Sequence, residues 1–180
     1  MQEGGIDLDK KRLYPRYIVI HHTGSRDVPI LNIDRYHSSL GWGVIVTSPQ
    51  PLVNDLIQKG FNKTRSGVMV SVGYHYLIRK NGKIENGRPD FVIGAHCRSQ
   101  GMNFDSIGIS LTGNFHPPDN PDGEKGHMEP SSEQINSLIG LIEGLSAKYY
   151  IPRENILLHR EVRGASTLCP GDNFKKYWLM

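Results

Sequence analysis

The segment Arg16-Tyr-Ile-Val-Ile-His-His-Thr23 is a short run of β-branched and aromatic residues, closed by Gly24 and Ser25. A run of this kind between turn-forming residues predicts a buried β-strand. The predicted strand ends in two adjacent histidines, His21 and His22. Because neighbouring side chains on a strand point to opposite faces of the sheet, only one of the two can face a given site.

Strand and helix patterns alternate along the rest of the chain. Further strands are predicted at 72–78, 83–85, 91–95, 106–112 and 155–159. Helices are predicted at 32–40, 131–151 and 172–179. Asn32 is the expected cap of the first helix, Ser131 and Gln134 form a capping box at the second, and Asn81-Gly82 makes a hairpin turn. This order predicts an α/β fold, a single domain with a mixed β-sheet flanked by helices.

Two segments carry more specific expectations. Gly140 and Gly144 each cost about 1 kcal/mol relative to alanine in a helix interior. We therefore expect the helix to approach a sheet closely at these glycines. The segment 114–130 is polar and broken by prolines and glycines, so we expect a surface loop with His116 and His127 in solvent.

The length of 180 residues suits one domain. We expect an N-terminal extension at 1–15 and a domain at 16–180, which is interrupted by an insertion at 43–70. Prolines and glycines in the insertion surround apolar residues at helical spacing, so we expect loops with one short helix. The apolar stretch of the insertion is flanked by Lys59, Lys63 and Arg65. The insertion is either a flap over a functional site or a surface elaboration.

The charge of the chain is close to balanced. Lys and Arg number 21 against 18 Asp and Glu, a net charge of +3. Binding to nucleic acid needs a concentrated basic face, so we expect no nucleic-acid partner. No apolar run approaches the roughly 20 residues that span a bilayer. The N-terminus also lacks the pattern of a secretory signal. Separately, we expect the protein to be a monomer.

The segment His159-Arg-Glu-Val-Arg-Gly-Ala-Ser-Thr-Leu-Cys169-Pro-Gly171 carries candidate metal ligands. His159 leaves a predicted strand, and Cys169 lies in a loop stiffened by proline, so the two side chains can converge. Zinc takes imidazole nitrogen and thiolate sulfur in a tetrahedral shell. His21 or His22 would supply a third ligand. Three protein ligands leave the fourth position for water, as in catalytic zinc sites.

The same residues admit other interpretations. A cysteine can be a small buried hydrophobic residue, and a histidine at a strand end can be an ordinary hydrogen-bonding group. Cys97 and Cys169 could form a disulfide, which excludes zinc because the ligand must be a free thiolate. Cys169 and His159 could instead form a nucleophilic dyad.

Short motifs follow one another over residues 16–178. They are His21-His-Thr-Gly-Ser25, Val72-Gly-Tyr-His-Tyr76, Gly87-Arg88, Gly94-Ala-His96, Asn103, Ser106-Ile-Gly-Ile109, Gly113-Asn-Phe115, His159-Arg-Glu-Val162 and Thr167-Leu-Cys-Pro-Gly171. This ordered set resembles the type 2 zinc amidases, which include phage amidase-type lysozymes and peptidoglycan recognition proteins. The resemblance implies their α/β fold and hydrolysis of the amide bond between N-acetylmuramic acid and L-alanine in peptidoglycan.

The resemblance also implies roles for single residues. His21, His159 and Cys169 match the zinc ligands, with His22 facing away. Tyr74 matches the catalytic tyrosine. Thr167 occupies a position that holds lysine in the phage enzymes and threonine in the recognition proteins. Zinc activates water and polarises the amide carbonyl, and the two hydroxyls would donate hydrogen bonds to the developing oxyanion.

Three further residues are expected near the substrate. His96 and Asn103 match positions that line the substrate cleft in the family. His37 is either a cleft-lining contact or a residue of a helix face. Ser110 stands where a related cytoplasmic branch has glutamate, so catalysis would depend on zinc and Tyr74.

Three function classes remain open. All three ligand positions are filled, which favours an enzyme over the alternative, a non-catalytic recognition module that binds muropeptides. A cysteine peptidase is the third. Since the expected substrate is the cell wall, the chain would act as a phage-type lysin released through a damaged membrane, or as an exported enzyme whose leader is removed. The insertion at 43–70 would then be a flap that contacts the wall or a surface elaboration.

Overall fold

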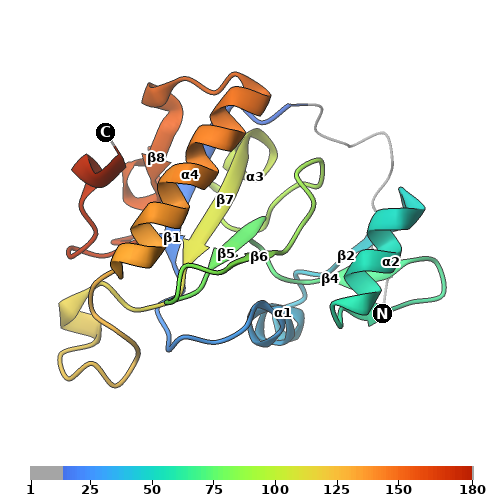
Figure 1. Ribbon diagram of the computed structural model, residues 1–180, viewed down its shortest axis with the longest axis horizontal. Helices are drawn as coiled ribbons and strands as arrows, with labels where there is room; N and C mark the ends of the chain where they lie inside the picture. Colours follow the sequence, from blue (N-terminus) through green and yellow to red (C-terminus); the bar gives the residue numbers. More distant parts are fainter. Residues whose placement is uncertain (1–13, 180) are drawn as a thin grey trace.

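The central element of the fold is a five-stranded mixed β-sheet. The computed structural model describes residues 14–179, and the strands run in the order β6-β5-β7-β1-β8 (Figure 1). Their bounds are β1 Tyr17–His22, β5 Tyr76–Ile78, β6 Ile84–Asn86, β7 Ser106–Leu111 and β8 Ile156–Leu158. β7 is parallel to β1 and β5, β8 is parallel to β1, and β6 returns antiparallel to β5. The predicted single-domain α/β fold with a mixed sheet is confirmed.

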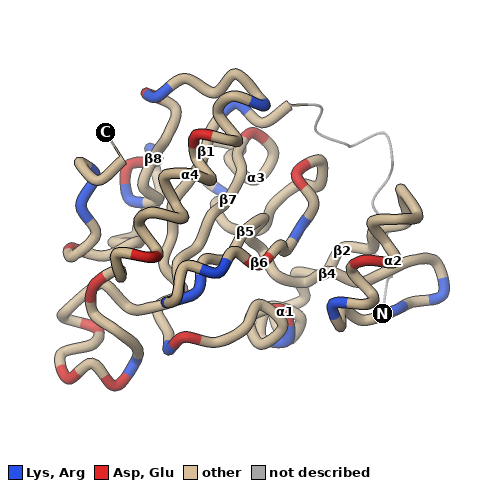
Figure 2. The backbone as a smooth tube through the Cα atoms, in the orientation of Figure 1, with Lys and Arg blue, Asp and Glu red and all other residues tan. Residues whose placement is uncertain are grey.

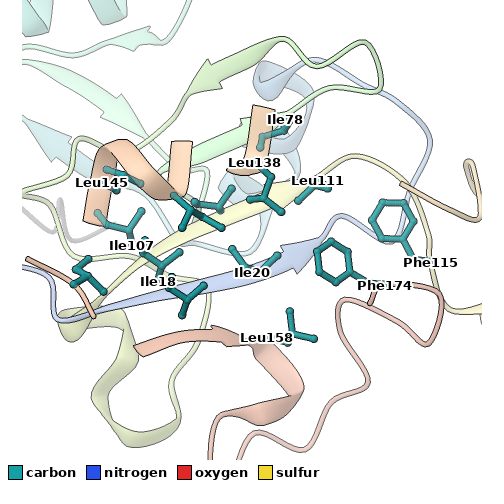
Figure 3. Packing of buried hydrophobic residues seen from close by; sticks show 14 residues of the cluster. Ile18, Ile20, Ile78, Ile107, Leu111, Phe115, Leu138, Leu145, Leu158 and Phe174 are labelled. Carbon is teal, nitrogen blue, oxygen red and sulfur yellow. The ribbon is translucent and has the colours of Figure 1, made fainter. Parts of the chain in front are cut away.

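Helix α4, Ser132–Tyr149, covers one face of this sheet. Alternate residues of β1 and β7, among them Ile18, Ile20 and Ile107, share one core cluster with Leu138 and Leu145 of the helix (Figure 3). Side chains at every second strand position share a face, so this packing assigns the residues between them to the other face.

The other face of β1 and β7 carries small and polar residues. In the parallel register, Val19 lies opposite Gly108 and His21 lies opposite Ser110. All four residues are buried. Glycine and serine have little side-chain volume, so this face leaves room for larger side chains beside His21.

Helix α4 begins as the capping box predicts. The Ser131 hydroxyl accepts from the Gln134 backbone N–H, and the Gln134 side chain accepts from the Ser131 N–H. The expectation for Gly140 and Gly144 is wrong, because a Cβ atom at either position would meet no atom within 4 Å. Both glycines face solvent, and no close packing compensates for their cost in the helix.

Helix α1, Ile30–Ser39, begins before its predicted start at residue 32. Pro29 occupies the N-cap position and makes no side-chain capping bond, so the expected capping role of Asn32 is wrong. The first free N–H of the helix, that of Ile30, donates instead to Oε2 of Glu85 over 2.8 Å, so a residue distant in sequence supplies the polar cap. The helix ends before Gly41, which has a φ of +76°.

Short helices connect the larger elements. They are η2 Ser99–Gly101, α3 Met102–Asp105, η3 Pro117–Asp119, η4 Arg153–Asn155, η5 His159–Glu161 and η6 Lys176–Leu179. The last of these replaces the longer helix expected at 172–179.

The polar segment 114–130 packs more closely than its composition suggests. Phe115 and Asn120 are fully buried, and His116 is buried as well. Nε2 of His127 lies 2.9 Å from Oε1 of Gln134. The expectation that both histidines are solvated is therefore wrong.

The insertion at 43–70 folds into its own small sheet. Strands β2 Val44–Val46, β4 Val68–Val70 and β3 Asn62–Lys63 pair antiparallel in the order β2-β4-β3, and helix α2 spans Gln50–Gln58. The predicted helix is present, but the expectation of a loop-rich segment is wrong. Prolines beside the start of α2 suit the first turn of a helix rather than break it.

The insertion shares a core with the main fold. Val53 and Leu56 of α2 are buried with Ile33 of α1 and Leu77 of β5. In Figure 1, α2, β2 and β4 lie together at one end of the molecule. The insertion is thus anchored by apolar packing at its inner face.

The predicted strand at 91–95 is wrong, because this segment is irregular. Its backbone bonds go to two different partners: Gly94 N–H donates to Asn103 O, and Ala95 N–H donates to Gly73 O. Val92 is buried in the same core as the insertion. The apolar pattern here reflects burial and not strand pairing.

Charged residues are spread over the whole fold. In the view of Figure 2, basic and acidic positions are interspersed along the chain. Within residues 14–179, none of the helices has the length and apolar character that a bilayer span requires.

Candidate metal centre and cleft

Three candidate ligands meet at one edge of the main sheet. His21 lies at the end of β1, His159 directly follows β8, and Cys169 lies in the loop beyond it. Because β1 and β8 are parallel neighbours, their carboxyl ends share this edge. One ligand atom of each residue lies within 4.8 Å of the others, and Sγ of Cys169 lies 3.7 Å from Nδ1 of His21. The sequence-predicted ligands are therefore brought together.

The loop that carries Cys169 is held by hydrogen bonds from Arg160 to Cys169 and to the residues that follow it. Arg160 N–H donates to Cys169 O over 2.9 Å, and the Arg160 guanidinium donates to Gly171 O and Phe174 O. Gly171 has a φ of +98°, and a Cβ there would lie 2.3 Å from the Phe115 carbonyl carbon. Only glycine fits this position, so the loop is fixed by the backbone as well as by Arg160.

The electrostatics of the three ligands suit a cation. Burial lowers the pKa of His21 well below its usual range and lowers the pKa of His159, so both imidazoles keep a lone pair at neutral pH. Burial raises the pKa of the Cys169 thiol to about 12. A buried thiol of this kind becomes a thiolate when a metal ion supplies the compensating charge.

These observations bear on the other interpretations of Cys169. Cys97 and Cys169 are both free thiols. A nucleophilic cysteine needs a depressed pKa, whereas the pKa of Cys169 is raised. Two imidazoles and one thiolate are a donor set that zinc accepts. The residues present therefore fit a zinc ion better than a disulfide or a catalytic dyad.

His22 points away from these ligands, as strand alternation predicts. Its Nδ1 accepts a hydrogen bond of 3.0 Å from the backbone N–H of Phe115. His22 thereby binds the segment that follows β7 and holds the end of β1 in place.

Tyr74 lies beside His21. The two ring centroids are 5.3 Å apart, and Tyr74 also packs against His37 at 5.6 Å. Burial raises the pKa of the Tyr74 phenol above its ordinary value. Tyr74 is therefore a protonated hydrogen-bond donor at neutral pH.

Thr167 is oriented by the loop that carries Cys169. Its Oγ1 accepts from the Cys169 backbone N–H over 3.1 Å. That bond uses a lone pair of Thr167, so its hydroxyl hydrogen is available to a bound substrate.

His96 and Asn103 lie behind the candidate ligands. Nδ1 of His96 is 3.0 Å from Nε2 of His21. Oδ1 of Asn103 accepts from the backbone N–H groups of His96 and Cys97, both over 2.8 Å. Like the three candidate ligands themselves, neither residue is part of the lining of the pocket beside Tyr74. These bonds give both residues a supporting role behind His21, and their contact with substrate stays a prediction.

A pocket of about 520 Å³ opens next to Tyr74. Its lining comes from the β1–α1 connection, from α1 and from Tyr74: Thr23, Gly24, Ser25, Arg26, Val28, Asn32, Ile33, Tyr36, His37 and Tyr74. His37 belongs to this lining, although its Nδ1 accepts from Gly73 N–H and the residue is largely buried. It is thus a helix-face residue that also borders the pocket.

Sequence reasoning missed residues that support the site. Arg160, which holds the Cys169 loop, lies inside the motif His159-Arg-Glu-Val162, but the motif by itself assigns it no role. Gly108 does carry a recognisable pattern, since a glycine inside a strand marks a place where another group approaches closely. Here that group is the His96 ring, whose Cδ2 would lie 2.5 Å from a Cβ at residue 108.

Comparison with known proteins gives consistent matches. The family model described as N-acetylmuramoyl-L-alanine amidase matches residues 11–172. The endolysin of Escherichia phage T7 is 32% identical over 111 residues, which is 61% of this chain and 65% of that protein. Peptidoglycan-recognition protein SC2 of Drosophila melanogaster is 30% identical over 170 residues, 89% of this chain and 70% of that protein.

A solved structure agrees with these relatives. N-acetylmuramoyl-L-alanine amidase LysC from Clostridium intestinale URNW superposes with a TM-score of 0.65 at 31% identity, covering 93% of this chain and 84% of that one. The matched region spans just under two thirds of the T7 endolysin, at 65% of its length.

Proposed function

The chain belongs to the N-acetylmuramoyl-L-alanine amidase family, and on that premise we propose that it hydrolyses the amide bond between N-acetylmuramic acid and L-alanine in peptidoglycan. The observation that carries the proposal is the grouping of His21, His159 and Cys169 beside Tyr74, which in turn lines a pocket of about 520 Å³. The pocket offers room for a substrate next to Tyr74.

A zinc ion is the proposed cofactor, held by His21, His159 and Cys169. The support is the donor set, the burial of His21 and the lowered pKa of both imidazoles. When bound, zinc supplies a Lewis acid for the scissile carbonyl and lowers the pKa of a water molecule.

Tyr74 and Thr167 are the proposed donors to the carbonyl oxygen. As the amide carbon becomes tetrahedral, negative charge grows on that oxygen, and a donor placed there is worth roughly 3 kcal/mol. The raised pKa of Tyr74 keeps its proton on the phenol. Thr167 retains a hydroxyl hydrogen because its Oγ1 accepts from Cys169 N–H.

The pocket beside Tyr74 is the proposed binding site for the muropeptide. Tyr36 on α1 is 63% exposed and lines it together with His37. An exposed ring on a pocket wall can cover the apolar face of a sugar or peptide. We propose that one copy of the chain acts alone, since all of these residues belong to a single chain.

Product analysis tests the proposal. Purified peptidoglycan is incubated with the protein, and the soluble products are identified by mass spectrometry. We expect free stem peptides that begin with L-alanine, together with glycan strands that keep the lactyl group. A recognition module that only binds muropeptides would bind the wall in stoichiometric amounts and release no stem peptide, and that result would contradict the proposed activity.

A further inference from the structure

A directional chain of hydrogen bonds lies behind His21. Nε2 of His21 is 3.0 Å from Nδ1 of His96, and Nε2 of His96 is 3.5 Å from Oγ of Ser106. The Ser106 hydroxyl donates to Met102 O over 2.6 Å. Since Ser106 uses its hydrogen on Met102, it can only accept from His96.

The direction of this chain fixes which nitrogen of His21 is free. If Nε2–H of His96 donates to Ser106, then Nδ1 of His96 has the lone pair and accepts from Nε2–H of His21. Nδ1 of His21 is then the nitrogen with a lone pair. This is the atom that faces Sγ of Cys169 at 3.7 Å.

The surroundings of His96 are shaped to its ring. A Cβ at Gly94 would lie 2.4 Å from Cδ2 of His96, and one at Gly108 would lie 2.5 Å from the same atom. Asn103 fixes the backbone of His96 by accepting its N–H. The ring therefore occupies space that two glycines leave open, and it has little freedom to turn.

We propose that His96 is a positioning residue that holds the ring and the tautomer of His21 so that Nδ1 is presented to the metal ion. Gly94 and Gly108 are glycine because the His96 ring fills the space of their side chains. The inference rests on the proposed zinc site, and it assigns His96 to the support of a ligand and not to contact with the substrate.

Two substitutions of similar size distinguish the loss of the hydrogen bond from His21 to His96 from the loss of packing at position 96. The amide of asparagine is the same number of bonds from Cα as imidazole Nδ1, whereas the amide of glutamine is as far as Nε2. His96→Asn therefore keeps a group that can accept from His21, and His96→Gln moves that group away. His127→Gln is the matched control. His127 also forms a hydrogen bond with a side chain, that of Gln134, but it lies on the segment 114–130 and not behind His21.

Zinc affinity is measured for the four proteins by competition with a chromophoric chelator, and circular dichroism verifies that each is folded. Loss of a residue that orients a metal ligand typically costs 10–100-fold in affinity. We expect this loss in His96→Gln, a substantially smaller loss in His96→Asn, and wild-type affinity in His127→Gln. The visible absorption bands of bound Co²⁺ should shift in His96→Gln and change less in His96→Asn.

The outcomes distinguish this inference from the function on which it rests. Wild-type affinity in His96→Gln, or an equal loss in both His96 variants, overturns the positioning role and leaves the zinc site standing. A wild-type chain that binds no zinc overturns the metal site itself and this inference with it.

Discussion

His21 and Cys169 are 148 residues apart in sequence, yet Nδ1 of the histidine lies 3.7 Å from Sγ of the cysteine. The parallel pairing of β1 with β8 makes this contact possible, because it places His21 and His159 at one edge and the following loop returns Cys169 to it. The fold therefore assembles three ligands from two distant parts of the chain.

Replacing the cysteine tests its role as a ligand. Cys169→Ser should lose bound zinc and lower amidase turnover by orders of magnitude, because a neutral hydroxyl is a poor substitute for thiolate. Cys97→Ser is the matched control, since Cys97 is the other cysteine of the chain and likewise a free thiol. Metal content per chain is measured by inductively coupled plasma mass spectrometry. Full zinc occupancy in Cys169→Ser would exclude the cysteine from the site.

Removing the hydroxyl of Tyr74 should affect turnover without affecting the metal. Tyr74→Phe keeps the ring packed against His21 and should lower kcat by roughly 10²–10³-fold, the usual effect of losing one oxyanion donor. Tyr150→Phe is the control, because Tyr150 is 91% exposed. Unchanged kcat in Tyr74→Phe would remove the phenol from the proposed chemistry.

The two solvent-facing glycines of α4 predict stabilised variants. Gly140→Ala and Gly144→Ala should each raise the free energy of unfolding by about 0.5–1 kcal/mol, because no atom obstructs the new methyl group. Gly108→Ala should do the opposite, since its Cβ would collide with the His96 ring. Urea denaturation measures all three. If alanine at 140 and 144 lowers the free energy of unfolding, the space beside these two glycines is not free for a methyl group.

The free energy of unfolding should decrease in acid because of the ionised carboxylate of Asp27. Its carboxylate accepts from the Arg79 guanidinium, the Thr112 hydroxyl and the Lys80 N–H, and the bond from Arg79 contributes most to lowering its pKa. A pKa that is lower in the folded chain adds stability above the unfolded value of about 3.9, and this stability is lost as the pH falls below that value.

Asp27→Asn isolates this contribution. The variant should be less stable than wild type at pH 7, by on the order of 1–2 kcal/mol for a partly exposed charged hydrogen bond. The difference should shrink as the pH is lowered below about 4, because Asp27 of the unfolded wild-type chain then takes up a proton while the folded chain still holds it as a carboxylate. Denaturation curves at several pH values measure it, and a difference that stays constant with pH would rule out the carboxylate charge as its cause.

The insertion at 43–70 should tolerate changes on its surface but not in its core. Leu56→Ala should cost about 2–5 kcal/mol of stability, because Leu56 is 1% exposed. Lys63→Glu with Arg65→Glu changes exposed residues and should leave stability unchanged. If that double variant loses activity on intact wall and keeps it on soluble muropeptides, the insertion contacts the wall. Equal activity on both substrates assigns it no targeting role.

The sequence was informative where a local pattern agreed with the tertiary structure. The run before His21 forms the predicted strand, and the capping box of Ser131 starts the predicted helix. The fold class followed from the order of these elements. The ordered motifs also predicted that His21, His159 and Cys169 converge, which the structure bears out as a grouping of side chains.

Other features depended on contacts that no local pattern contains. The strands of the insertion are only two or three residues long, and their stability comes from packing against α1 and β5. The Val92 segment looked like a strand because it is buried, yet its backbone bonds go to Asn103 and Gly73 instead of a ladder. The position of His96 behind His21 could not be read from its own motif. The glycine at position 108, inside strand β7, was the feature of the sequence that indicated the close approach of another group there.

The measurement that tests the central claim most directly is the rate at which stem peptide is released from peptidoglycan before chelation, after chelation and after zinc is restored. We predict that removal of the metal abolishes release and that about one equivalent of Zn²⁺ per chain restores it, while Cys169→Ser stays inactive at the same zinc concentration. Release that continues at the original rate in the metal-depleted wild-type protein would contradict the account.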